Sequence, residues 1–114
     1  MTRSARFVSA VLGLALGTAV SARSETVDLS VSANGFQPKV VNVRKGETVR
    51  LQLSSGGGEH CFALDAWRIE KRVRPGQATV VELVPDRAGT FPFYCCLESG
   101  AAAEREHGRL VVTE

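Results

Sequence analysis

The residues of this chain best suited to chemistry are two histidines and a pair of adjacent cysteines. Cys95 and Cys96 follow an aromatic run, and His107 precedes the apolar run that closes the chain. His60 stands at the start of an earlier short apolar run. A thiolate and two imidazoles, brought together from distant segments, are typical ligands of a mononuclear copper site. The only methionine is Met1, so the rest of the chain has no thioether to offer a metal.

The elements that must position these residues are short β-strands. From residue 26 onward, apolar and polar residues mostly alternate with a period of two, and turn residues interrupt the pattern at short intervals. The expected strands are 27–32, 41–43, 48–53, 60–64, 67–73, 79–84, 90–95 and 109–113. Many short strands at this spacing are typical of an antiparallel sandwich or barrel. Only residues 101–106 favour helix formation, so we expect a short helical turn there.

The first 22 residues differ in composition from the rest. Arg3 and Arg6 precede an apolar run at 7–20, and small residues follow it up to Ala22. This pattern predicts a secretory signal peptide at residues 1–22 and one domain at residues 23–114. The apolar run is short for a transmembrane helix, and an uncleaved anchor is the alternative. We expect a secreted or periplasmic protein with no membrane span after cleavage.

Charge and motifs exclude other classes of function. Removal of residues 1–22 lowers the formal net charge from +2 to about zero. Because no basic run or aromatic stripe occurs, we expect no nucleic-acid partner. The chain also lacks a phosphate-binding glycine motif, a Ser-His-Asp arrangement and an HExxH motif. We therefore expect no catalytic residues, and a metal-binding module or electron carrier rather than an enzyme.

Several short motifs occur in the order that is typical of cupredoxins. They are Phe36-Gln37-Pro38, Lys45-Gly46-Glu47-Thr48-Val49, His60, Arg74-Pro75-Gly76, Gly89-Thr90-Phe91-Pro92-Phe93-Tyr94-Cys95 and Gly108-Arg109-Leu110-Val111-Val112. Each motif alone is weak, but their order and spacing are specific and extend over residues 26–114. The chain therefore resembles the cupredoxin family. The resemblance implies a Greek-key β-sandwich of about seven to eight strands that binds copper at one end, most often to transfer single electrons.

The resemblance identifies His60 as the first imidazole ligand and Cys95 as the thiolate. Phe91, Phe93 and Cys95 alternate onto one face of the expected strand, and Cys96 then points to the other face. Counting back from the closing glycine favours Cys96 instead, but loop length varies in the family whereas strand parity does not slip. We therefore expect Cys95 to bind the metal, with Cys96 as the alternative.

Beyond the cysteines, the sequence departs from the family pattern. Glu98 stands where blue-copper members often carry histidine, and Glu106 stands at the usual axial methionine. The binuclear purple-copper pattern is disfavoured, because Ser99 occupies the place of its second cysteine. Glu106 is an alternative to Glu98 as the oxygen donor. The expected ligands of one copper ion, cycling between Cu(II) and Cu(I), are His60, Cys95, Glu98 and His107.

Such a ligand set has consequences for function. Replacement of a thioether by a carboxylate hardens the site and favours Cu(II). The resemblance then implies a reduction potential below that of blue-copper members and a colour shifted away from blue, as in the red-copper relatives. We expect an exported copper-binding protein that transfers electrons or handles copper, with a redox or copper-delivery protein as partner. The alternatives are a degenerate, metal-free interaction domain and a red-copper-like enzyme with an open coordination position.

The strand arrangement of the family also implies a disulfide. Cys61 follows His60, Cys96 follows Cys95, and the two corresponding strands are neighbours in the family. Cys61 and Cys96 would then face the same side, away from the metal. We expect a disulfide between them, which leaves Cys95 to the metal. The alternative is that all three cysteines are reduced and Cys96 is available to copper.

Overall fold

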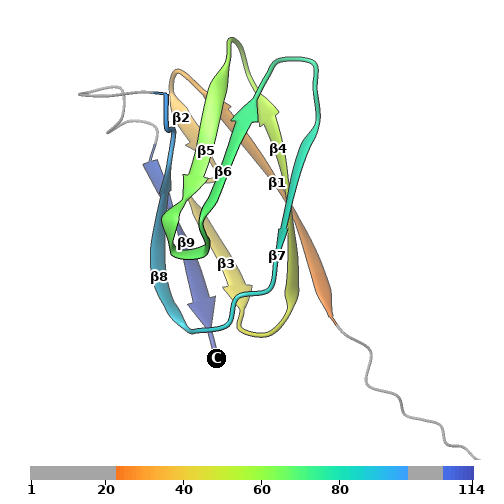
Figure 1. Ribbon diagram of the computed structural model, residues 1–114, viewed down its shortest axis with the longest axis vertical. Helices are drawn as coiled ribbons and strands as arrows, with labels where there is room; N and C mark the ends of the chain where they lie inside the picture. The colour runs from red at the N-terminus through yellow and green to blue at the C-terminus, as the bar shows by residue number, and fades with distance from the viewer. Residues whose placement is uncertain (1–22, 98–106) are drawn as a thin grey trace, which may run out of the picture.

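The computed structural model describes residues 23–97 and 107–114, and these residues form two β-sheets packed face to face (Figure 1). The first sheet has the order β2-β1-β4-β7 and consists of β1 (Ser24–Ser32), β2 (Gly35–Gln37), β4 (Thr48–Ser55) and β7 (Thr79–Leu83). The second has the order β3-β9-β8-β5-β6 and consists of β3 (Val40–Arg44), β5 (His60–Leu64), β6 (Ile69–Val73), β8 (Gly89–Tyr94) and β9 (His107–Thr113). The predicted all-β sandwich is confirmed.

The arrangement differs from the sequence expectation in several details. The pairs β1–β4 and β3–β9 are parallel, whereas the spacing of the strands predicted antiparallel pairing. The pattern predicts a break around residue 35, but Gly35–Gln37 forms β2, which pairs antiparallel with β1. Trp67 is predicted to begin a strand, whereas it ends a 3₁₀ turn, Asp65–Trp67, that is followed by Arg68 in a left-handed conformation (φ 55°). The signal peptide predicted at 1–22 and the helical turn predicted at 101–106 lie outside the described residues.

The core between the sheets fixes which residues face inward. Phe36 of β2, Phe62 of β5 and Phe93 of β8 are all buried and pack against one another. The ring of Phe93 lies 5.0 Å from that of Phe36 and 5.3 Å from that of Phe62, measured between centroids. Because side chains alternate along a strand, the inward positions of Phe62 and Phe93 set the faces of the residues that precede or follow them.

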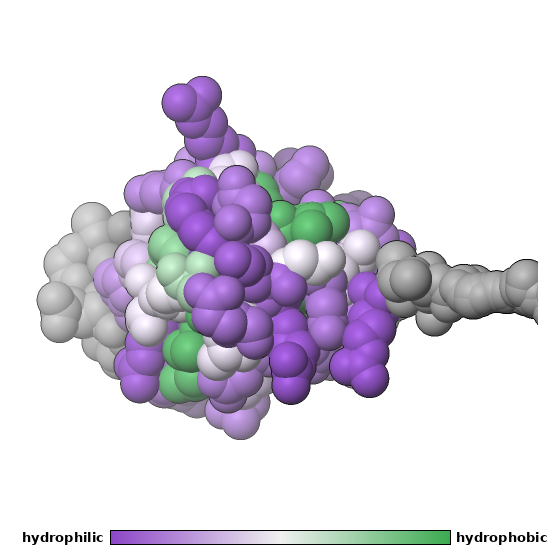
Figure 2. Space-filling model, turned by 90° about the horizontal axis from the view of Figure 1, so that it is seen from below, coloured by the Kyte–Doolittle hydropathy of each residue, from purple (hydrophilic) through white to green (hydrophobic). Residues whose placement is uncertain are grey.

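Three of the predicted ligand residues, His60, Cys95 and His107, lie at one end of the sandwich. The start of β5, the end of β8 and the start of β9 meet at the upper end in Figure 1. The other end carries the β3–β4 and β7–β8 turns, and its surface is mostly hydrophilic with small, separate hydrophobic patches (Figure 2). No helix in the described part of the chain is long and apolar enough to cross a membrane.

Candidate metal site

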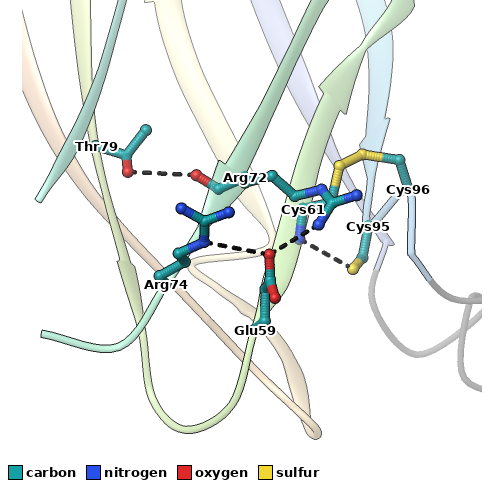
Figure 3. Close-up of polar contacts among 7 residues, drawn as sticks. All are labelled: Glu59, Cys61, Arg72, Arg74, Thr79, Cys95 and Cys96. Carbon is teal, nitrogen blue, oxygen red and sulfur yellow. Dashed lines mark hydrogen bonds and ion pairs between the residues drawn. A yellow bond between two sulfur atoms is a disulfide. The ribbon is translucent and has the colours of Figure 1, made fainter. Parts of the chain in front are cut away.

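Cys61 lies on β5, and Cys95 and Cys96 directly follow the adjacent strand β8. Ala63 of β5 pairs with Tyr94 of β8 in antiparallel register. Extension of this register by two residues sets Cys61 opposite Cys96, and a disulfide joins them across a Cα–Cα distance of 5.1 Å (Figure 3). The predicted disulfide is confirmed. Both cysteines share the face of Ala63 and Tyr94, which is the outer face of the five-stranded sheet.

Cys95 has the opposite orientation. It continues the inward alternation of Phe93, is 1% exposed and remains a thiol. The backbone N–H of Cys61 donates a hydrogen bond to its Sγ across 3.3 Å (Figure 3). An N–H group directed at sulfur stabilises negative charge on that sulfur, so this contact suits a thiolate as well as a thiol.

His60 is the one polar or charged side chain that is buried among the described residues, with 6% of its surface exposed. Its Nε2 lies 2.8 Å from the carbonyl oxygen of Gly57. Because a carbonyl only accepts hydrogen bonds, Nε2 is the nitrogen that carries the proton, and a neutral ring then has its lone pair on Nδ1. A backbone carbonyl that orients the imidazole in this way is typical of metal-binding histidines.

His60 and Cys95 share the inner face of the sheet. The register between β5 and β8 sets Phe62 opposite Cys95, and His60 precedes Phe62 by two residues on the same face. Such diagonal neighbours are typically about 7–8 Å apart between Cα atoms, within reach of one imidazole and one thiolate. The fold thus brings together two of the four predicted ligands, and their nitrogen and sulfur donors suit copper.

Two ion pairs hold the segment that leads into His60. Oε2 of Glu59 accepts hydrogen bonds from Nη1 of Arg72 at 2.8 Å and Nε of Arg74 at 3.3 Å (Figure 3). These contacts, the one from Arg72 most of all, lower the pKa of Glu59 below its usual value. They connect the start of β5 to β6 on the outer side of the sheet.

His107 lies on the other side of the sheet from Cys95. It begins β9, where it is exposed and pairs with Tyr94. Paired residues of antiparallel strands point to the same face, and the rings of Tyr94 and His107 lie 6.0 Å apart. The described structure therefore does not bring His107 to His60 and Cys95. The remaining predicted oxygen donors, Glu98 and its alternative Glu106, lie outside the described residues.

Glu70 is a potential metal ligand that the sequence did not predict. Within residues 23–97 and 107–114, one group of three potential metal ligands has all its ligand atoms within 4.8 Å of one another, and it consists of Cys61, Glu70 and Cys96. The alternating charges at 68–74 indicate a solvated strand, but they do not indicate that this strand pairs with the one that carries Cys61. Cys61 and Cys96 have no thiolate to offer while the disulfide is intact.

The chain is similar in sequence to a known protein family and to a curated protein. A family model described as "Cupredoxin-like domain" matches residues 5–112. A curated relative, cytochrome c oxidase subunit 2 of Thermus thermophilus, is 27% identical over 89 residues, which are 78% of this chain and 66% of the relative. The chain thus spans slightly less than two thirds of that protein.

Solved structures share the fold at low sequence identity. The periplasmic domain of subunit II of cytochrome oxidase (CoxB) of Bradyrhizobium japonicum matches with a TM-score of 0.69 and 16% identity, over 78% of this chain and 83% of that one. The metal binding domain of the Streptococcus pneumoniae D39 Cu(I) exporting P-type ATPase CopA matches with a TM-score of 0.65 and 13% identity, over 84% of this chain and 92% of that one. At these identities the likeness concerns the fold alone.

Proposed function

The chain belongs to the cupredoxin-like domain family, and we propose that it is an exported copper-binding protein that transfers electrons or handles copper. The observation that carries this proposal is the shared inward orientation of His60 and Cys95 at one end of the sandwich. The similarity to cytochrome c oxidase subunit 2 and to the metal binding domain of a Cu(I) exporting ATPase supports the same class of function.

We propose a single copper ion bound by His60, Cys95, Glu98 and His107. The first two already face the same side of the sheet, and Glu106 is an alternative to Glu98 as oxygen donor. His107 has to turn away from Tyr94 to take part, since its strand position directs it to the outer face. Bound copper would supply one-electron chemistry between Cu(II) and Cu(I).

The chain's own groups have defined tasks in this proposal. The carbonyl of Gly57 orients the His60 ring, and the N–H of Cys61 offsets charge on the Cys95 sulfur. Both ligands are buried, so the sandwich excludes most water from them. A thiolate and an imidazole held rigidly in a dry site need little reorganisation when the charge changes, which favours fast electron transfer.

We also propose a signal peptide at 1–22, a functional domain at 23–114 and a secreted or periplasmic location. The Cys61–Cys96 disulfide supports this location, because structural disulfides persist in oxidising compartments. A redox or copper-delivery protein is the proposed partner.

The test is to add Cu(II) to the purified mature protein and record its visible absorption and paramagnetic-resonance spectra. We expect a thiolate-to-copper charge-transfer band that disappears in Cys95→Ser and persists in a Cys61→Ser/Cys96→Ser double variant. Spectra that do not change in Cys95→Ser would contradict the site. A protein that takes up no copper would instead support a metal-free interaction domain. The position of His107 on the outer face of the sheet favours this alternative.

The contribution of His107 needs its own variant. If His107 is a ligand, His107→Ala changes the copper hyperfine splitting and weakens copper binding, while Arg109→Ala, two residues further along the same face of β9, leaves both unchanged. Identical spectra for His107→Ala and the parent protein would remove His107 from the ligand set and leave His60 and Cys95 in it.

A further inference from the structure

We propose that reduction of the Cys61–Cys96 disulfide opens a second metal site, in which both thiolates and the carboxylate of Glu70 bind a thiophilic divalent cation such as Zn²⁺. This site lies on the outer face of the five-stranded sheet, whereas His60 and Cys95 face inward. Alternation along β5 and β8 separates the two sets, although they are adjacent in sequence. The second site therefore does not depend on copper binding by the first.

The spacing of the ligand atoms suits one ion. The two sulfurs and a carboxylate oxygen of Glu70 all lie within 4.8 Å of one another. Zn–S bonds of about 2.3 Å and Zn–O bonds of about 2.0–2.2 Å at tetrahedral angles set two ligand atoms of one ion roughly 3.5–3.8 Å apart, a spacing that small side-chain rotations bring within reach of these atoms. Once the disulfide is open, the sulfurs of Cys61 and Cys96 can separate to ligand spacing by side-chain rotation alone.

The three ligands stand on or directly beside paired strands. Glu70 of β6 pairs with Ala63 of β5, and Arg72 of β6 pairs with Cys61. The three residues line a surface cavity of about 220 Å³, whose other lining residues are Lys71, Arg72 and Leu97. This volume holds a metal ion and a water molecule as fourth ligand, which completes the tetrahedral geometry that Zn²⁺ prefers.

The charge of the surroundings also fits a bound divalent cation. Two thiolates and one carboxylate around a divalent cation leave one negative charge in excess. Lys71 and Arg72 line the same cavity and offset that charge. Arg72 is held beside the disulfide by its 2.8 Å contact with Glu59 (Figure 3). The carboxylate favours Zn²⁺ over Cu(I), because Zn²⁺ accepts mixed sulfur and oxygen ligands.

Opening of the site needs a donor of two electrons. A phosphine attacks one sulfur, the S–S bond breaks, and water converts the adduct to the phosphine oxide. The protein gains two electrons and two protons, which appear as the thiols of Cys61 and Cys96. A dithiol gives the same product by exchange and leaves as its own disulfide. The cation then displaces the two thiol protons to the buffer.

The first experiment uses the Cys95→Ser protein, in which Cys61 and Cys96 are the only cysteines, with Co²⁺ as a coloured probe for a Zn²⁺ site. We expect thiolate-to-cobalt absorption at one Co²⁺ per chain after reduction by a phosphine, and none before it. Zn²⁺ should abolish the absorption by displacing Co²⁺. A reduced protein that remains folded by circular dichroism but shows no such band overturns the proposal. Loss of the β-sheet spectrum on reduction overturns it equally, because the strands must hold the ligands.

Matched variants then identify the third ligand. Glu70→Gln should weaken Co²⁺ binding to the reduced protein by at least about tenfold, since even outer-shell partners of a metal contribute that much. Glu82→Gln is the control, because Glu82 pairs with Arg50 in the other sheet. Equal affinities of these two variants would exclude Glu70. His60→Ala should leave the cobalt band intact, so failure of the copper site and failure of this site give different results.

Discussion

Tyr94 is the only tyrosine of the chain, and its environment changes its acidity. Its hydroxyl donates to Oδ1 and Oδ2 of Asp65, at 3.0 and 3.1 Å. This hydrogen bond is the largest of the effects that raise the pKa of Tyr94, and partial desolvation and the negative charges of Asp65 and Glu70 act in the same direction. The contact lies on the outer face of β8, one residue from Cys95. The pKa of Tyr94 is therefore a probe of the structure at this end of the sheet.

Replacement of Asp65 should therefore make Tyr94 more acidic. We expect Asp65→Asn to lower the pKa of Tyr94 toward the ordinary value of 10.0. Titration of tyrosinate absorbance measures this without interference, because no other tyrosine is present. Asp86→Asn is the control, since Asp86 contacts Arg87 instead. Equal titration midpoints for Asp65→Asn and the parent protein would count against the contact.

The same contact predicts how stability depends on pH. A raised pKa in the folded state means that the contribution of Tyr94 is fully present below the unfolded-state pKa, near 10. Above that value the unfolded chain loses its phenolic proton first. The free energy of unfolding should therefore fall as the pH rises through the folded-state pKa, and the fall should be smaller in Asp65→Asn. Urea unfolding of both proteins at a series of alkaline pH values measures the difference.

The strands β5 and β8 are joined covalently as well as by pairing. Their disulfide spans 35 residues of sequence. We expect the Cys61→Ser/Cys96→Ser double variant to lose about 3–4 kcal/mol of unfolding free energy, because the unfolded chain gains loop entropy. Urea unfolding measures the loss. Cys95→Ser, which keeps the disulfide, is the comparison, and a double variant as stable as the parent would show that strand pairing alone holds this end together.

Gly108 lets β9 pack closely against its neighbours. A Cβ atom at this position would overlap the ring of Phe93 and lie 2.7 Å from the carbonyl oxygen of Lys39. Phe93 is buried in the core, so its ring has no space to move into. We expect Gly108→Ala to lower the unfolding free energy by about 1–3 kcal/mol, the usual cost of overpacking.

A second glycine provides the control for this substitution. At Gly56, in the loop between β4 and β5, the nearest neighbour of an added Cβ is Cβ of Ser32 at 3.2 Å. Gly56 is exposed and Ser32 is half-buried, so both can move slightly to make room. Gly56→Ala should therefore lower the unfolding free energy less than Gly108→Ala does in the same urea experiment. A larger loss of unfolding free energy in Gly56→Ala than in Gly108→Ala would contradict the tight packing around Gly108.

Strand parity was predictable from the sequence, and strand register was not. The alternation of Phe91, Phe93 and Cys95 indicates an inward Cys95, and this depends only on the geometry of one strand. The face of His107 depends on its pairing with Tyr94, which residues 95–106 do not encode in any simple pattern. The position of Glu70 beside the disulfide likewise follows from the pairing of β5 with β6. Tertiary neighbours of this kind decide a metal site, and local periodicity does not contain them.

The two ends of the sandwich differ in the residues that they carry. His60, Cys95 and the disulfide are at one end of the sandwich, and the other end is mostly hydrophilic with small, separate hydrophobic patches (Figure 2). Exposed large hydrophobic residues among those described are Val80, Val84 and Leu97. Leu97 lies beside the disulfide cavity, at the end where a redox or copper-delivery partner would have to approach for short-range transfer.

Export would favour both the disulfide and the proposed copper site, because an oxidising compartment pairs Cys61 with Cys96 and leaves Cys95 as the thiol. In a bacterial host we expect the full chain to reach the periplasm and lose residues 1–22, so that the mature protein begins at Arg23 and carries the disulfide. Leu14→Arg places a charge in the apolar run of the predicted signal and should block export. The retained protein should have all three cysteines reduced, because the cytosol keeps thiols reduced.

Fractionation, intact mass and thiol counting of the two proteins measure this outcome. Thr2→Ser, a conservative change before the apolar run, should behave like the parent. A parent chain that stays unprocessed in the cytosol would contradict the signal peptide. A Leu14→Arg chain that still forms the disulfide in the cytosol would show that oxidants there, such as glutathione disulfide, can form it without export, because the folded domain holds the two cysteines close together.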